Sequence, residues 1–348
     1  MEKIYFHIGF GKTGSSALQS YLSFNSEHEL PDGKGRLLYC SFQKNGEILH
    51  GEKLKKEAEC SPLKYIASDP DVAATGLFKK IWKHKKIRRD LHKIIKLGYT
   101  PIFSQEDWGR RAGEFLSADF FSKINCTAHL IVYVRPQVEW FNSGWWQWWA
   151  WQEDFKEPVD IINAWGFNFM LWAGQIRQWK SLPNIEGVSV RIQSSDIVKD
   201  FIQLLGVGRH AGNAYEARNN TSLSPMLIKL LLNFKEIRSM HAADVDSILS
   251  KYLSFEGKVP WVIDSHLSET IINATRDDNL LLMNMLSADD KEKMKNDPRW
   301  WDKDHYNDRK TWKDEDFELT KNDMHELLKQ AIPAIIELGR KVDDLGYS

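Results

Sequence analysis

The chain has 348 residues and carries 47 Lys and Arg against 48 Asp and Glu, which gives a formal net charge of −1. An apolar share of 42% and a charged share of 27% exclude a disordered chain, a collagen-like chain and a coiled-coil rod. The near-neutral charge argues against a general nucleic-acid-binding protein. The unusual quantity is the 15 tryptophans, so their positions enter the functional interpretation.

Cysteines and apolar runs indicate the compartment. The three cysteines, Cys40, Cys60 and Cys126, are widely spaced and form no CxxC pair, so we expect neither a disulfide framework nor a zinc knuckle. No apolar run reaches 18 residues, and the first apolar segment is interrupted at Gly9. We therefore expect no membrane span and no signal peptide, and a location in the reducing cytoplasm.

Strand-like and helix-like segments alternate along the chain. In chain order they are a strand at 3–8, a helix at 15–24, a strand at 36–42, a loop with short helices at 43–76, a helix at 77–97, strands at 99–104, 128–134 and 188–192, and a helix at 195–205 that ends at Gly206. Helices with charged connections follow from about residue 225. Pro101 predicts that the strand at 99–104 lies at a sheet edge, or that the proline marks its start.

This alternation is typical of an α/β fold in which helices flank a parallel sheet. The sequence has no internal repeat and no low-complexity linker. We therefore expect a single domain over residues 1–348, with a core over about 1–225 and a helical C-terminal elaboration over about 226–348.

The turn after the first strand is suited to binding a phosphate-like group. It contains Gly9, Gly11 and Gly14, and a helix begins directly after it. Glycines allow backbone amides to face an anion, and the helix N-terminus adds its dipole. Ser15 and Ser16 add hydroxyl groups. A glycine turn without a ligand is the simpler alternative, but it does not account for the Lys-Thr-Gly-Ser-Ser run inside it.

Three classes of protein could use this loop. The glycines match the dinucleotide pattern G-x-G-x-x-G, but the acidic residue expected after the second strand is missing. The end of a nucleoside-triphosphate P-loop is present, but Phe6 stands where its first glycine is needed. The run from Gly9 through Lys12 to Gln19 resembles the 5′-phosphosulfate loop of sulfotransferases that use 3′-phosphoadenosine 5′-phosphosulfate.

A second segment supports the third class. Arg135 follows the strand at 128–134, and Ser143 lies eight residues later. An arginine at the end of a parallel strand is well placed to bind a phosphate, although a surface ion pair is the plain alternative. The pair resembles the 3′-phosphate element of sulfotransferases. The segments 187–207 and 218–224, the latter with Asn220, resemble downstream segments of bacterial members.

The resemblance implies a P-loop NTPase-like sulfotransferase fold and a set of binding residues. It is firm over about 1–25 and 128–145, looser over 187–225, and weak between 30 and 97 and beyond 230. The implied cofactor is 3′-phosphoadenosine 5′-phosphosulfate, its product is 3′-phosphoadenosine 5′-phosphate, and no metal is required. The residues implied to bind it are Gly11, Lys12, Thr13, Gly14, Ser15, Ser16, Arg135, Ser143 and Asn220.

Sulfuryl transfer needs a cation for the leaving group and a base for the acceptor hydroxyl. We assign the first role to Lys12. Glu106, just past the strand at 99–104, is the candidate base, and Asp107 is the next choice. The alternative for Glu106 is a carboxylate that stabilises a helix start. We expect His7 to pack in the core rather than to act as a base.

Charge and tryptophan are both concentrated locally. Residues 79–96 contain nine Lys or Arg, which indicates a solvated helix face or, alternatively, an electrostatic funnel for an anionic ligand. Six tryptophans lie between 140 and 151 and would cover roughly half of an α-helix, with Trp146 outside that arc. Core packing and an oligomer interface are alternatives to acceptor binding. We assign Trp108, Trp145 and Trp149 to the acceptor site.

These features together predict a cytoplasmic, bacterial sulfotransferase. Its expected acceptor is a hydroxyl of a small molecule or glycan, most plausibly of a carbohydrate or glycolipid. We expect no nucleic-acid partner and leave a homo-oligomer open. One alternative is a P-loop kinase, and another is a non-catalytic, Trp-rich glycan-binding module. The sequence does not identify the acceptor.

Overall fold

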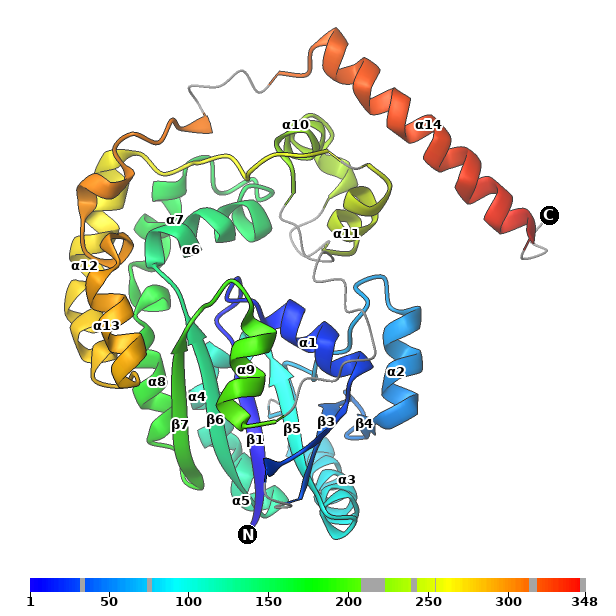
Figure 1. Ribbon diagram of the computed structural model, residues 1–348, viewed down its shortest axis with the longest axis vertical. Coiled ribbons are helices and arrows are strands. Elements are labelled where there is room, and N and C mark those ends of the chain that lie inside the picture. Colours follow the sequence, from blue (N-terminus) through cyan, green and yellow to red (C-terminus); the bar gives the residue numbers. More distant parts are fainter. Residues whose placement is uncertain are drawn as a thin grey trace.

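The computed structural model describes residues 1–31, 35–73, 77–207, 223–238, 243–253, 255–312 and 318–344. A mostly parallel central sheet is flanked by helices, so the expected α/β class is confirmed (Figure 1). The strands are β1 (Glu2–Ile8), β2 (Glu27–Glu29), β3 (Arg36–Phe42), β4 (Ile48–His50), β5 (Tyr99–Gln105), β6 (Cys126–Val134) and β7 (Ile185–Ile192).

The order of the sheet is β2-β3-β5-β1-β6-β7, and β4 pairs with β3. The pairs β3–β5, β5–β1, β1–β6 and β6–β7 are parallel, whereas β2 and β4 pair with β3 in the antiparallel sense. Numbered by their sequence, the five parallel strands therefore run 2-3-1-4-5. That order differs from the 3-2-1-4-5-6 order of the dinucleotide-binding fold. The glycine pattern after β1 thus lacks the structural context of a dinucleotide site.

The helices cover both faces and extend beyond the sheet. They are α1 (Ser15–Phe24), α2 (Gly51–Cys60), α3 (Leu77–Lys96), α4 (Ala112–Ala118), α5 (Phe120–Ile124), α6 (Gln137–Gly144), α7 (Pro158–Trp165), α8 (Trp172–Lys180), α9 (Ile197–Leu205), α10 (Pro225–Asn233), α11 (Ala243–Tyr252), α12 (Ser265–Met283), α13 (Ala288–Asn296) and α14 (Lys321–Asp344). Short turns at Glu106–Arg110 (η2) and Trp145–Trp149 (η3) complete the site region, and η3 is π-helical.

Alternation along the strands divides the core into two layers. Phe6, Phe103 and Leu130 face one cluster, into which α3, α4, α5 and α8 pack. Ile102 and Ile131 face the other cluster, with α1, α2 and α9. Because neighbouring side chains of a strand point to opposite faces, buried apolar strands of this kind require helices on both sides.

Two expectations about local structure can be compared with the fold. Of the two positions predicted for Pro101, the sheet edge is excluded, because β5 runs between β3 and β1. The strand tolerates it because pairing with β1 begins only at Ile102, so Pro101 stands near the strand start. The segment 43–76 contains β4 and the whole of α2. Only Leu54 and Ala58 of α2 are buried, too few apolar positions to show a period.

The helical C-terminal part packs against helices of the sheet layer. Asp278 of α12 accepts hydrogen bonds from the amides of Ala173 and Gly174 at the start of α8, at 2.8 and 2.9 Å. Asn279 of the same helix accepts one from Gln137 of α6, at 2.7 Å. Both pairs are buried or partly buried, so α12 is fixed against α6 and α8. In contrast, Figure 1 shows α14 extending away from the rest of the chain.

Candidate phosphate-binding site

Three neighbouring parallel strands end at the same edge of the sheet. Ile8 of β1 pairs with Gln105 of β5, and His7 pairs with Ile131 near the end of β6. The loop 9–14, Glu106 and Arg135 follow these three strand ends directly. Ligands of open α/β sheets bind at this edge, so the structure brings together the residues that the sequence places after separate strands.

The loop after β1 has an unusual backbone. Gly11, Lys12 and Gly14 all have positive φ, at 66°, 50° and 94°. For Lys12 this left-handed conformation costs about 1–2 kcal/mol, so surrounding contacts must hold it. The Trp140 Nε1 donates to the carbonyls of Phe10 and Gly11, at 3.1 and 3.0 Å. These two bonds hold the carbonyls of the loop in place.

Arg135 makes the direct link between the two predicted phosphate elements. Its Nη1 donates to the carbonyl oxygen of Lys12 at 2.9 Å, and lies 3.4 Å from the Ser143 Oγ. The carbonyl of Arg135 in turn accepts a hydrogen bond from the Trp172 Nε1 at 3.0 Å. Segments 123 residues apart in the chain therefore form one polar unit.

Several polar groups of the loop are available to a ligand. Gly14 occupies the N-cap of α1 and offers no capping side chain, so the first amides of the helix lack that partner. The hydroxyls of Thr13 and Ser15 are buried and have no hydrogen-bond partner among the described residues. Ser16 lies 3.5 Å from the Tyr65 Oη, which donates to it. Amides and hydroxyls in this arrangement fit a phosphate group.

Glu106, the first residue of η2, lies in close contact with Gly9 of the loop. A Cβ at Gly9 would lie 2.9 Å from the Glu106 Cα and 2.5 Å from the Ser15 Oγ, so only glycine permits this approach. The Gly9 carbonyl accepts a hydrogen bond from the Gly109 amide at 3.0 Å. The backbone of β1 and that of η2 are thereby held together.

The protein atoms that surround Lys12 and Glu106 shift the pKa of both side chains. Burial, and then the charge of Asp107, raise the pKa of Glu106 to about 7, while Lys12 opposes the shift. Burial lowers the pKa of Lys12, and Glu106 and Asp246 oppose that shift. Both side chains keep partial contact with solvent. A carboxyl group that ionises near neutral pH therefore lies close to a lysine at the phosphate loop.

A cluster of arginines surrounds the second phosphate element. Burial lowers the pKa of Arg135, and the Glu139 carboxylate, 3.7 Å from its Nη2, opposes this. The same carboxylate pairs with Arg299 at 3.2 Å and with Arg309 at 3.4 Å. Residues 297–309 lie where the family resemblance is weak, so these two arginines were not assigned to the site from the sequence.

The three tryptophans assigned to the acceptor site have different surroundings. Trp108 is fully buried, stacks on Phe6 at a centroid distance of 4.1 Å and donates to the Pro70 carbonyl. It is a core residue and does not reach a ligand, so its assignment is corrected. Trp149 is 3% exposed and packs on Phe141 at 5.1 Å, which also favours a core role. Trp145 lines a cavity.

Trp148, which was not assigned to the site from the sequence, also lies against the phosphate loop. A Cβ at Gly11 would come within 2.8 Å of its indole ring. With α-helical spacing, Trp148 lies on the same side as Trp140, which also contacts the loop. The turn η3 is π-helical, and Trp146, which falls outside the predicted arc, is nevertheless only 4% exposed.

Three sequence-based assignments remain, those of His7, Asn220 and the basic helix α3. The His7 Nδ1 lies 2.7 Å from the buried Ser104 Oγ, and burial lowers the His7 pKa to about 3, so the expected core role is confirmed. Asn220 lies outside the described residues. In α3, Ile87, Leu91 and Ile94 are buried, as expected for an amphipathic helix. Figure 1 shows α3 near the end of the sheet where the chain begins, which favours a solvated basic face.

Comparisons with known proteins add no relative: no family model, no curated protein and no solved structure matches the chain. Within the described ranges, no group of three or more His, Cys, Asp or Glu side chains could hold a metal ion. In the same part of the chain, no helix is both long and apolar enough to cross a bilayer.

Proposed function

We propose that the chain is a sulfotransferase that moves the sulfuryl group of 3′-phosphoadenosine 5′-phosphosulfate to a hydroxyl, with a carbohydrate as the favoured acceptor class. The observation that carries the proposal is the contact between two phosphate elements, in which Arg135 binds the Lys12 carbonyl and approaches Ser143. One site with two separate phosphate elements suits a nucleotide that is phosphorylated at both its 5′ and its 3′ positions.

The loop would hold the 5′ end of the nucleotide. The amides at the start of α1 and the hydroxyls of Thr13, Ser15 and Ser16 supply donors without strong competing partners. Arg135 and Ser143 would hold the 3′-phosphate, because a guanidinium can make two parallel hydrogen bonds to phosphate oxygens. Arg299 and Arg309 add positive charge beside this element.

Lys12 and Glu106 have complementary roles in the transfer, one toward the leaving group and one toward the acceptor hydroxyl. When bound, the nucleotide supplies an activated sulfuryl group. Glu106, whose pKa is raised to about 7, accepts the proton of the acceptor hydroxyl as that oxygen bonds to sulfur. Lys12 would lie beside the bridging oxygen and would stabilise the negative charge that grows there as its bond to sulfur breaks. The leaving product is 3′-phosphoadenosine 5′-phosphate.

Calorimetry with 3′-phosphoadenosine 5′-phosphate tests whether the chain binds the proposed nucleotide. We expect the full chain to bind this ligand at least about tenfold more tightly than adenosine 5′-phosphate, because charged hydrogen bonds to the extra phosphate contribute about 1.5–3 kcal/mol. Arg135→Lys and Ser143→Ala should reduce that preference. Arg88→Lys, an exposed change on α3, is the matched control.

Three outcomes would overturn the assignment. The first is the absence of binding at millimolar ligand by a chain whose circular dichroism shows it folded. The second is equal affinity for the two nucleotides, since the 3′-phosphate would then make no contact. The third is magnesium-dependent ATP binding that 3′-phosphoadenosine 5′-phosphate does not displace, which indicates a kinase.

A further inference from the structure

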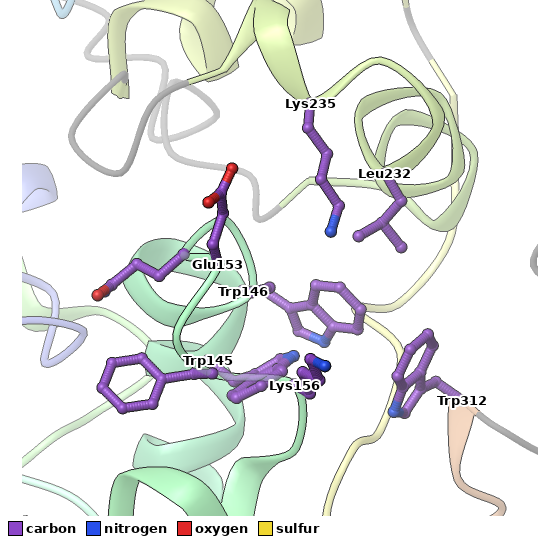
Figure 2. A pocket seen from close by; sticks show the side chains of 10 residues that line it. Trp145, Trp146, Glu153, Lys156, Leu232, Lys235 and Trp312 are labelled. Atoms are coloured by element: carbon purple, nitrogen blue, oxygen red, sulfur yellow. The ribbon is translucent and has the colours of Figure 1, made fainter. Parts of the chain in front are cut away.

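A pocket lined by aromatic rings opens beside η3. Its volume is about 330 Å³, and the side chains that define it are Trp145, Trp146, Phe155, Lys156, Lys235 and Trp312. These residues come from η3, the segment after it, the turn after α10, and the chain after α13 (Figure 2). A volume of about 300 Å³ or more is enough for a small ligand. We call this cavity the Trp145 pocket.

The aromatic walls of the Trp145 pocket are held in place. The Trp146 Nε1 donates to the Pro260 carbonyl at 2.8 Å, and its ring meets the Trp312 ring edge-on at 5.9 Å. The Trp312 amide donates to the Trp261 carbonyl at 2.6 Å. Indoles fixed in this way present flat apolar faces without further ordering, which lowers the entropic cost of binding.

The charged side chains that line the pocket are two lysines and one glutamate, all three exposed, and Gln152 lines it as well. The Trp145 side chain is only 3% exposed, and its Nε1 has no hydrogen-bond acceptor among the described residues. Figure 2 shows Lys235 reaching toward Trp146 from one side and Lys156 lying on the other side. Glu153 also lines the pocket, but its carboxylate is turned away from the Trp145 ring. A buried donor without an acceptor is costly, so a ligand rich in acceptors would satisfy it.

The pocket is distinct from the phosphate site. It takes Trp145, Trp146 and Ala150 from the η3 region. Trp148, which lies against Gly11 of the phosphate loop, does not line it. Ligand binding in the pocket therefore requires neither the nucleotide nor sulfuryl transfer, and this inference does not rest on the proposed function.

We propose that the Trp145 pocket binds one anionic sugar unit of an acidic saccharide. Indole faces stack on the C–H faces of a pyranose ring, as aromatic side chains do with flat apolar surfaces. The Trp145 N–H and the two ammonium groups bind its carboxylate or sulfate and its hydroxyl oxygens. Lys156 and Lys235 are exposed, so an anionic group gains charge-assisted hydrogen bonds from them that a neutral sugar does not. A purely apolar ligand would leave the Trp145 N–H unsatisfied.

Calorimetry with a galacturonate trimer tests this proposal on the full chain. Maltotriose, which has the same length and no charge, should bind at least about tenfold more weakly, because charged hydrogen bonds are roughly twice as strong as neutral ones. The double variant Lys156→Gln, Lys235→Gln should lose about tenfold in affinity for the trimer. Trp145→Phe, which replaces the indole by a smaller aromatic ring and removes the N–H, should lose less. Lys180→Gln, an exposed change on α8, should bind as the parent chain does.

Each of the other outcomes would refute the proposal. One is the absence of trimer binding at millimolar concentration while thermal melting shows a folded chain. Another is unchanged affinity in the double lysine variant, which would place the saccharide elsewhere. Equal binding of maltotriose would remove the anionic part of the proposal. Displacement of the trimer by benzoate at equal concentration would indicate a site for planar aromatic acids.

Discussion

Glu106 carries a carboxyl group that folding makes harder to ionise. Its pKa rises from 4.5 to about 7 because it is buried and lies near Asp107. Between these pH values the folded chain binds more protons than the unfolded chain, so the free energy of unfolding falls as the pH rises. Glu106→Gln should abolish that fall and stabilise the chain at pH 8 by up to about 3 kcal/mol. Urea denaturation at pH 5 and pH 8 measures the difference.

Asp107→Asn provides the comparison for this measurement. The charge of Asp107 is the second cause of the raised Glu106 pKa, so its removal should move the fall in stability to lower pH without abolishing it. A Glu106→Gln variant with the same pH dependence as the parent chain would show that another group causes the fall.

At the residue scale, polar side chains after strand ends were predictable and aromatic contacts were not. Lys12, Glu106 and Arg135 each follow a parallel strand, and the carboxyl ends of such strands share one edge. Trp108 was assigned to the acceptor site and lies two residues after Glu106 in the sequence, but the Trp108 ring packs in the core against Phe6. Whether an indole points inward or outward depends on tertiary packing, which spacing alone does not encode.

The elements that contact the loop are α6, through Trp140, and η3, through Trp148. The buried Trp140 donates its N–H to two loop carbonyls, those of Phe10 and Gly11, while Lys12 keeps a left-handed backbone. Trp140→Phe leaves these buried carbonyls without that donor, which costs about 1–3 kcal/mol beyond the lost volume. Thermal melting should show this loss, and affinity for 3′-phosphoadenosine 5′-phosphate should fall with it.

Trp300→Phe is the matched control for Trp140→Phe. Trp300 is also buried, at 1% exposure, but its Nε1 has no hydrogen-bond partner among the described residues. The control therefore removes similar volume and no hydrogen bond. Equal destabilisation by the two changes would mean that the N–H of Trp140 does not hold the loop.

At the element scale, periodic segments were predicted well and irregular ones were not. α1 spans the predicted residues 15–24, and α3 ends at 96, one residue before its predicted end. Both have an apolar face with helical spacing. α2 was predicted only as one of the short helices within 43–76, without bounds, because only Leu54 and Ala58 face the core. The π-helical turn η3 was not predicted, because its residues are of the same types as those of an α-helix.

At the scale of the whole molecule, the C-terminal part contributes to sites that the N-terminal core begins. Arg299 and Arg309 pair with Glu139 beside the second phosphate element, and Trp312 closes the Trp145 pocket. The sequence predicted helices here but no contacts, because contacts between distant segments depend on how the layers assemble. The α/β class, in contrast, follows from alternation that is visible locally.

α14 differs from the rest of the C-terminal part. Leu328, Ile332, Ile335 and Ile336 are each about half exposed or more, and Figure 1 shows the helix extending outward. Its described contacts include a 3.6 Å ion pair between Asp323 and Lys229 and the burial of Leu327. Since surface ion pairs contribute about 0–1 kcal/mol, a chain that ends at residue 317 should melt within about 3 °C of the full chain.

A shorter chain that ends at residue 296 provides the contrast. It lacks Trp300 and Tyr306, which are 1% and 2% exposed, and it lacks Arg299 beside Glu139. Loss of a buried tryptophan side chain alone costs about 3–5 kcal/mol of folding stability. The chain that ends at residue 296 should therefore melt far below the full chain or fail to fold. If the chain ending at 317 melted as low as the one ending at 296, α14 would be an integral part of the folded core, and its exposed apolar face would have to be covered in solution.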